Sequence, residues 1–140
     1  MTRTRSTGKF LVTAALALAL AATAAGKTSS TVIGKGVIIK GSKIAYGSAT
    51  AKSPTSVSAQ IAATPNQNVK VQWSMTCTKG GTSDADAYNS STTPKSGQST
   101  VMTPATVKLD LPFVHPTSCA ITIYGTMLKG GKETMTILQN

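Results

Sequence analysis

The fold of this chain is decided by a ten-residue stretch in its middle, Val69-Lys70-Val71-Gln72-Trp73-Ser74-Met75-Thr76-Cys77-Thr78. Apolar and polar side chains alternate along it without a break. Alternation of apolar and polar side chains with a period of two residues is typical of a strand in an antiparallel sheet that has one solvent-exposed face and one buried face. We therefore predict a half-buried β-strand at residues 69–78.

The same alternation continues on the N-terminal side of this strand. Residues 56–63 alternate in the same way, and turn-forming residues 65–68 separate the two runs, which predicts a hairpin over residues 56–78. Residues 106–111 also alternate, and residues 36–40 and 43–50 resemble two more strands, although their apolar residues run together and leave the buried face ambiguous. Pro104 interrupts what could otherwise be one strand from Ser99 to Leu111, because proline cannot donate to a strand ladder.

The C-terminal end predicts a second hairpin. Residues 119–129 and 134–138 have strand patterns, and the pair Gly130-Gly131 between them tolerates the positive φ angles of a tight turn. No stretch after Gly26 carries a helical apolar period. Six to eight short strands separated by turn signals favour an all-β fold, a small antiparallel β-sandwich of immunoglobulin-like architecture, with a small barrel as the alternative.

The first 24 residues have the three regions of a signal peptide. Basic Arg3, Arg5 and Lys9 precede an apolar run at residues 10–20 and then small residues. We expect a signal-peptide helix at residues 1–24, which is cleaved after Ala24 or one residue later. The rest of the chain is expected to form a flexible segment at residues 25–35 and one domain at residues 36–140. An uncleaved anchor is the alternative, but the apolar run is short for a membrane span. The expected product is secreted, without stable membrane insertion.

Cys77 and Cys119 are the only cysteines, and each lies on the apolar face of its predicted strand. Two inward-facing thiols in an exported protein predict a disulfide. By chain entropy, closing a loop of this length stabilises the fold by roughly 4 kcal/mol. Two separate thiols remain the alternative, whereas redox-active pairs are usually close in sequence and exposed.

Trp73 lies four residues before Cys77 on the same face, which favours a place in the core near the disulfide. Immunoglobulin domains also combine a tryptophan with a disulfide, but their tryptophan lies between the two cysteines. They also have a tyrosine two residues before the second cysteine, a position that Thr117 occupies in this chain. The architecture is therefore comparable to that of an immunoglobulin domain, but these residues do not support membership of the immunoglobulin family. The predicted core residues are Trp73, Val71, Met75, Ile121 and Ile123.

The chain is basic, and its basic residues argue against nucleic acid as a partner. Loss of Arg3, Arg5 and Lys9 lowers the formal net charge from +10 to +7 and leaves lysine as the sole cation. Arginine supplies the bidentate contacts of most nucleic-acid readers, and aromatic residues for base stacking are scarce. The simplest interpretation is that the scattered lysines give a diffuse positive potential that keeps the protein soluble. The alternative is a weak attraction to anionic envelope polymers or membrane surfaces.

A set of short motifs lies between residues 65 and 140: Trp73-Ser74-Met75-Thr76-Cys77, Lys79-Gly80-Gly81, Ser96-Gly97, Thr103-Pro104, Leu111-Pro112 and Pro116-Thr117-Ser118-Cys119. With these motifs the chain resembles a group of small exported two-cysteine proteins of actinomycete bacteria. That group has no established activity, so the resemblance implies an extracellular β domain and no active site.

Residues for catalysis are few. His115 is the one histidine, and it lies in a loop between Pro112 and Pro116, five residues after Asp110. No nucleophile elbow places a serine beside it, and nothing brings Asp110 and Glu133 together as an acid and base pair. We predict no catalytic set, cofactor or metal site, and consider a small hydrolase using His115 less favoured.

Residues 78–98 are rich in Ser, Thr and Gly and predict a long loop, the most suitable part of the chain for binding. Its acidic cluster resembles the opening of a calcium loop but lacks the loop glycine and the closing glutamate. A solvated loop is favoured over a weak calcium site. The candidate binding residues are Asp84, Asp86, Tyr88 and Asn89.

Taken together, these patterns predict a secreted, non-enzymatic module that binds an extracellular macromolecule or an anionic envelope polymer. The alternative is a secreted inhibitor or toxin that presents the loop at residues 78–98. The ligand and the oligomeric state are not specified by the residues.

Overall fold

The computed structural model describes residues 29–80 and 91–140, and these residues form eight strands and no helix. The predicted signal peptide lies outside the described residues. The strands are β1 (Thr31–Ile38), β2 (Ile44–Lys52), β3 (Val57–Thr64), β4 (Asn68–Lys79), β5 (Ser91–Met102), β6 (Ala105–Leu109), β7 (Ser118–Met127) and β8 (Lys132–Gln139).

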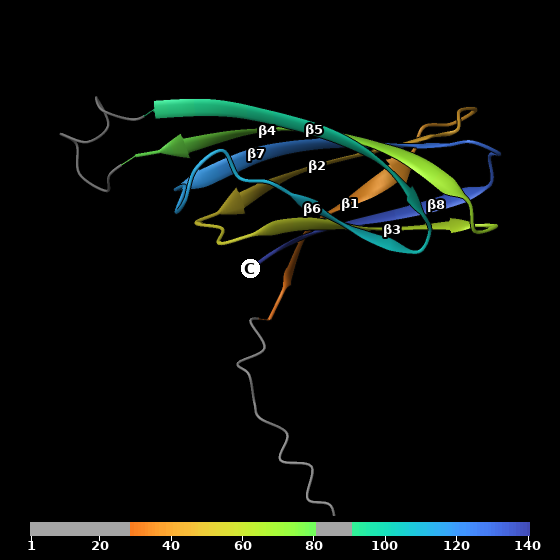
Figure 1. Cartoon of the computed structure of the whole chain (residues 1–140), viewed down its shortest axis with the longest axis horizontal. Coiled ribbons are helices and arrows are strands. Elements are labelled where there is room, and N and C mark those ends of the chain that lie inside the picture. The colour runs from red at the N-terminus through yellow and green to blue at the C-terminus, as the bar shows by residue number, and fades with distance from the viewer. Residues whose placement is uncertain (1–28, 81–90) are drawn as a thin grey trace, which may run out of the picture.

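All eight strands belong to one antiparallel sheet with the order β5-β4-β7-β2-β1-β8-β3-β6. Strand β1 joins the two halves of the sheet: residues 31–36 pair with β8, and Val37 and Ile38 pair with β2. The sheet curls until its edge strands β5 and β6 approach each other (Figure 1). The all-β prediction is confirmed, and the shape is nearer to a barrel than to two separate sheets.

Both predicted hairpins are wrong, although their strands exist. β3 pairs with β6 and β8, while β4 pairs with β5 and β7. β7 pairs with β2 and β4, and β8 pairs with β1 and β3. The turns at residues 65–67 and 128–131 therefore carry the chain from one half of the sheet to the other instead of folding it back on its neighbour.

Two segment boundaries also differ from expectation. Residues 31–35, expected to be flexible, form the first part of β1 and pair with β8. Residues 91–98, expected to lie in a loop, belong to β5, which pairs with β4 along its whole length. The Ser and Thr content that indicates a loop is equally suited to a strand whose side chains face water, because β-branched Thr has high strand propensity.

Alternate side chains of the strands point into the curled sheet and form the core, which explains the strict alternation of residues 69–77. Trp73, Val71, Met75, Ile121 and Ile123 all lie in it. The Trp73 indole packs against Gly97 of β5, where an added Cβ atom would lie 2.6 Å from Cζ2 of the ring. A residue with a side chain at position 97 would therefore displace the ring.

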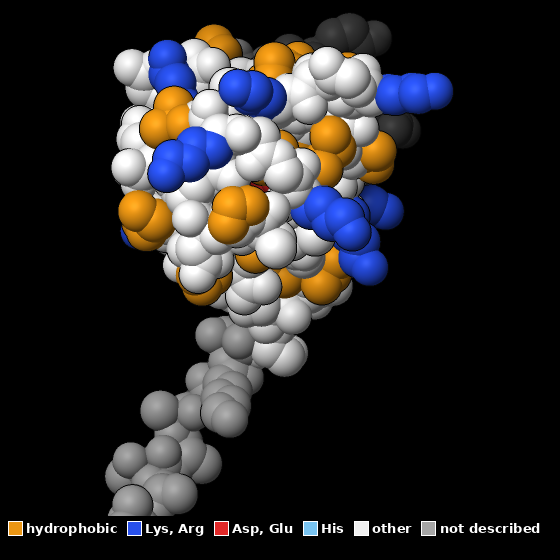
Figure 2. All heavy atoms as spheres, turned by 90° about the vertical axis from the view of Figure 1, so that its right-hand side faces the viewer, with side chains coloured by type: hydrophobic (Ala, Val, Ile, Leu, Met, Phe, Trp, Pro, Cys, Tyr) orange, Lys and Arg blue, Asp and Glu red, His pale blue; other side chains and the backbone are white. Residues whose placement is uncertain are grey.

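One end of the molecule is held together by buried Gln67, between β3 and β4. Its Nε2 donates to the carbonyls of Pro65 and Gly130, at 3.2 and 2.7 Å, and its Oε1 accepts from Lys129 N at 2.7 Å. Its backbone bonds Thr103, between β5 and β6. A buried amide is stable only when it is hydrogen-bonded. Gln67 therefore fixes the relative positions of the β3–β4, β5–β6 and β7–β8 turns. Figure 2 shows this end, where lysine and apolar side chains are interspersed.

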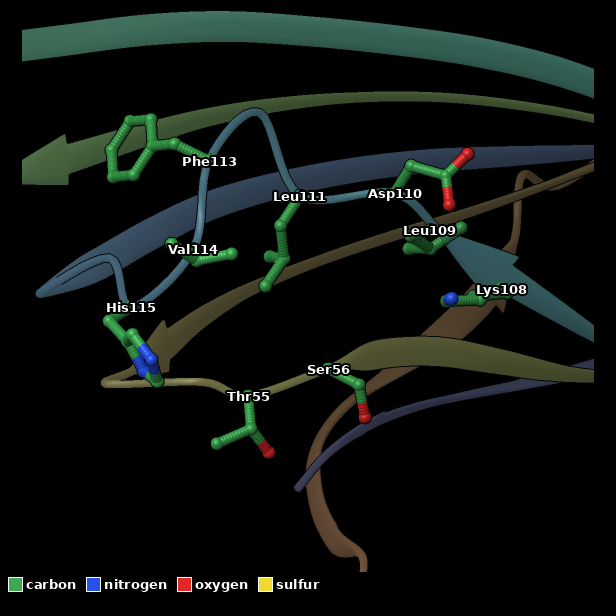
Figure 3. Close-up of a pocket in the computed structure, with 9 residues that line it drawn as sticks. All are labelled: Thr55, Ser56, Lys108, Leu109, Asp110, Leu111, Phe113, Val114 and His115. Carbon is green, nitrogen blue, oxygen red and sulfur yellow. The ribbon is translucent and has the colours of Figure 1, made fainter.

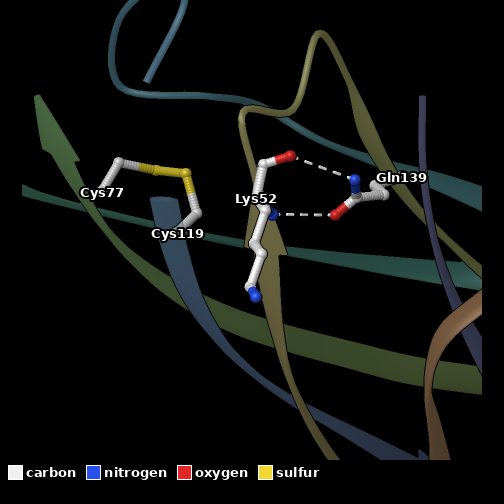
Figure 4. Close-up of a disulfide and its surroundings, with 4 residues drawn as sticks. All are labelled: Lys52, Cys77, Cys119 and Gln139. Carbon is white, nitrogen blue, oxygen red and sulfur yellow. Dashed lines mark hydrogen bonds between the residues drawn. A yellow bond between two sulfur atoms is a disulfide. The ribbon is translucent and has the colours of Figure 1, made fainter. Parts of the chain in front are cut away.

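The opposite end carries the predicted disulfide, which is confirmed. Cys77 and Cys119 are directly opposite each other on the adjacent strands β4 and β7, so the bond reinforces one half of the sheet and does not clamp two layers. Beside it, the Gln139 amide exchanges two hydrogen bonds with the backbone of Lys52, at 3.0 and 3.2 Å (Figure 4). This pair ties β8 to the end of β2 in the other half.

Candidate functional site

The predicted binding residues Asp84, Asp86, Tyr88 and Asn89 lie outside the described residues. What is described is the base of that connection. Thr117 bonds Gly80 through its side chain, at 2.9 and 3.1 Å, and its backbone N donates to Thr78 O at 2.8 Å. The connection between β4 and β5 therefore starts from a fixed point next to the disulfide.

The structure does bring His115 into a pocket, of about 370 Å³, between the β2–β3 turn and the β6–β7 connection. Its lining combines polar and apolar side chains, from the buried Leu109 to Val114, which is 75% exposed. Figure 3 shows the lining residues, which are Thr55, Ser56, Lys108, Leu109, Asp110, Leu111, Phe113, Val114 and His115.

The polar groups of this pocket do not form a catalytic set. In Figure 3 the Asp110 carboxylate points away from the His115 ring. Within residues 29–80 and 91–140 no hydrogen bond joins that ring to Asp110, Ser56 or Thr55. A nucleophile needs a base in hydrogen-bond reach, and the base needs an orienting partner. The arrangement is therefore that of a half-open apolar hollow.

A second feature lies on the outer face of the sheet, where one row of side chains crosses five adjacent strands. Tyr46 of β2 is directly opposite Tyr124 of β7, and their ring centroids are 5.2 Å apart with a 50° interplanar angle. The two residues are 38% and 41% exposed, in spite of their central strands. We call this the tyrosine row, and its members in spatial order are Val37, Tyr46, Tyr124, Gln72 and Gln98.

The surroundings of the tyrosine row are polar and almost free of charge. On one side it is flanked by a row of hydroxyl side chains, which we call the hydroxyl row and which consists of Ser48, Thr122, Ser74 and Ser96. Neither row contains an ionisable cation or carboxylate. On the other side, Lys70 is the charged member of a row that also contains Thr126 and Thr100. This neutrality is notable in a chain with a formal net charge of +10.

The β5 end of the tyrosine row is hollowed. A shallow pocket of about 280 Å³ is lined by Gln72, Gln98, Ser96, Gly97 and the edge of Trp73. The Trp73 indole packs against Gly97 from the core side, at the place where a Cβ atom of residue 97 would otherwise lie. Two amides and a hydroxyl thus surround a depression next to the exposed rings.

A third unusual group is the Glu133 carboxyl, which is 4% exposed and has no hydrogen-bond partner on either oxygen. It points toward Gly125 of β7, where an added Cβ would collide with Oε1. Burial raises the pKa of Glu133 to about 7. The carboxyl is therefore largely protonated in mildly acidic solution, because burial disfavours its charged form.

Neither the tyrosine row nor the buried carboxyl is predicted by the motifs considered above. Glu133 shares the parity of Met135 and Ile137, which is a signal for its burial. Tyr46 and Tyr124 lie on the polar parity of their strands, which predicts exposure but not contact between them. Their contact depends on the register between β2 and β7.

Within the described ranges, no three His, Cys, Asp or Glu side chains are grouped as metal ligands would be. The same residues include no helix of the length and apolarity that a membrane crossing requires. No protein-family profile and no curated protein matches the chain.

Proposed function

We propose that this protein is an exported, non-enzymatic binding module that attaches to an extracellular macromolecule of the cell envelope through its outer sheet face. Export is supported by the signal-peptide pattern of residues 1–24 and is consistent with the disulfide, since such bonds persist outside the cytosol. In this proposal the curled sheet serves as a rigid scaffold, in the way that sandwiches of immunoglobulin-like architecture do.

The observation that carries the proposal is the tyrosine row. Large aromatic rings are costly to expose, and in the described residues Tyr46 and Tyr124 expose theirs side by side on the outer face of the sheet. Tyrosine is enriched at binding surfaces because its ring is a large apolar body with a polar tip. The rings are held by central strands, so little conformational freedom is lost on binding.

The test is cosedimentation of the purified protein with bacterial cell-wall material. We expect the wild type to sediment with the material and the double variant Tyr46→Ala/Tyr124→Ala to stay in solution. Met102→Ala/Leu128→Ala is the matched control, because both side chains are 60% exposed but lie outside the tyrosine row. Thermal melts verify that the variants remain folded. Absence of the wild type from every pellet, or equal sedimentation of the tyrosine variant, would overturn the proposal.

A further inference from the structure

We propose that the tyrosine row binds a neutral polysaccharide, with successive sugar rings lying across the strands from Tyr46 toward Gln98. This inference rests on the proposed function, because it assigns a ligand class to the same face. Four properties of the row support it: its aromatic rings, its length, its hydrogen-bonding groups and its lack of charge.

The rings provide the stacking surface. One face of a pyranose presents a patch of C–H groups, which packs on the electron-rich face of an aromatic ring. Tyr46 and Tyr124 present two such rings 5.2 Å apart, each residue more than a third exposed. Adjacent sugar rings of one chain are spaced closely enough to contact both, and Val37 extends the apolar surface at the β1 end.

The row is long enough for a chain and not only for a single sugar. It crosses the five strands β1, β2, β7, β4 and β5. Neighbouring strands lie about 4.8 Å apart, so the row extends over roughly 19 Å. A linear polymer lying perpendicular to the strands would contact every member.

The hydrogen-bonding groups are suited to sugar hydroxyls, which both donate and accept. Gln72 and Gln98 each offer an amide NH₂ and a carbonyl oxygen, and they border the hollow above Gly97. Ser74, Ser96 and Thr122 in the hydroxyl row add groups that can donate or accept. A sugar that stacks on Tyr124 therefore has polar partners on the next strand.

The charge distribution favours a neutral polymer over a phosphate-rich one. No lysine lies in the tyrosine row or the hydroxyl row, although the chain has eleven lysines after residue 26. A polyanion would bind most tightly to a surface with many lysines, and its affinity would fall steeply as the salt concentration rises. A neutral glycan would bind this face with little dependence on salt.

The experiment is affinity electrophoresis of the purified protein in gels that contain β-glucan, galactomannan, dextran or polyphosphate, at low and high salt. We expect at least one neutral glycan to retard the wild type at both salt concentrations. Tyr46→Ala and Tyr124→Ala should each weaken that binding about tenfold, the factor that corresponds to roughly 1.4 kcal/mol. Tyr46→Phe/Tyr124→Phe keeps both rings and should retain most of it. Lys70→Ala is the charge control and should bind as the wild type does.

Three results would overturn the inference: retardation by polyphosphate alone, tyrosine variants that bind as tightly as the wild type, or a dimer in solution that the tyrosine substitutions dissociate. Cosedimentation with cell-wall material distinguishes failure of the ligand class from failure of the proposed function. Retention on the wall without retardation by any neutral glycan refutes the ligand class and leaves the proposed function intact. If the protein is neither retained on the wall nor retarded by a neutral glycan, the ligand class and the proposed function are both refuted.

Discussion

The buried carboxyl of Glu133 predicts that the stability of this protein decreases as the pH rises from about 4.5 to about 7. Its pKa is raised from the ordinary value of 4.5, which applies to the unfolded chain, to about 7 in the folded protein. Between these values the folded state holds a proton that the unfolded state releases, so the free energy of unfolding falls with rising pH and levels off above about pH 7. The change corresponds to roughly 2–3 kcal/mol, allowing for partial hydration of the site.

The perturbation that tests this is Glu133→Gln, which keeps the shape of the side chain and removes its charge. At pH 5 the variant should have nearly the wild-type stability, because the folded wild type then buries an uncharged carboxyl. At pH 8 it should be more stable by roughly 2–3 kcal/mol, since only the wild type then buries an ionised carboxylate.

The assay is urea unfolding of both proteins at several pH values from 5 to 8. Asp110→Asn is the control, because it removes a carboxylate from an exposed position and should keep the steep pH dependence that Glu133 causes. Parallel pH profiles for the wild type and Glu133→Gln would refute the reasoning, since they would mean that Glu133 does not titrate differently in the two states.

Three further predictions concern single features of the fold. Gly97→Ala should lower the free energy of unfolding by about 1–3 kcal/mol, because the new methyl group would displace the Trp73 ring, and a blue or red shift of tryptophan fluorescence would report the displacement. Replacing both Cys77 and Cys119 by alanine should cost about 4 kcal/mol in chemical denaturation, given their sequence separation of 42; a loss near zero would contradict the chain-entropy argument. His115→Gly should raise the melting temperature by relieving the positive φ of 54°, a gain of about 1 kcal/mol, whereas an unchanged or lower melting temperature would show that contacts of the imidazole outweigh the strain.

Local patterns in the sequence were enough to locate most strands. Alternation at residues 69–78 and 119–127 identified β4 and β7 and the side chains that face inward, because side-chain direction in a strand depends only on parity. The disulfide followed from the same parity. Strand β5 was missed because its Ser- and Thr-rich residues have no apolar alternation, and an edge strand with modest burial does not require one.

The partners of each strand could not be predicted from local patterns. A turn such as Gly130-Gly131 can close a hairpin or carry the chain across a core, and both uses favour the same residues. The choice depends on which arrangement covers the apolar faces of all eight strands at once. The hairpin expected between β7 and β8 was therefore wrong, although its turn and both strands were placed correctly.

The sequence alone thus determined an all-β chain with one disulfide, a defined inward face on most strands and a leader-like N-terminal pattern, since each of these depends on residue type and short-range order. Only the tertiary structure decided that Tyr46 meets Tyr124, that Gln72 and Gln98 continue their row, and that Glu133 is buried against Gly125. These contacts join residues far apart in the chain. Their register is set by the packing of the whole curled sheet, which no single segment encodes.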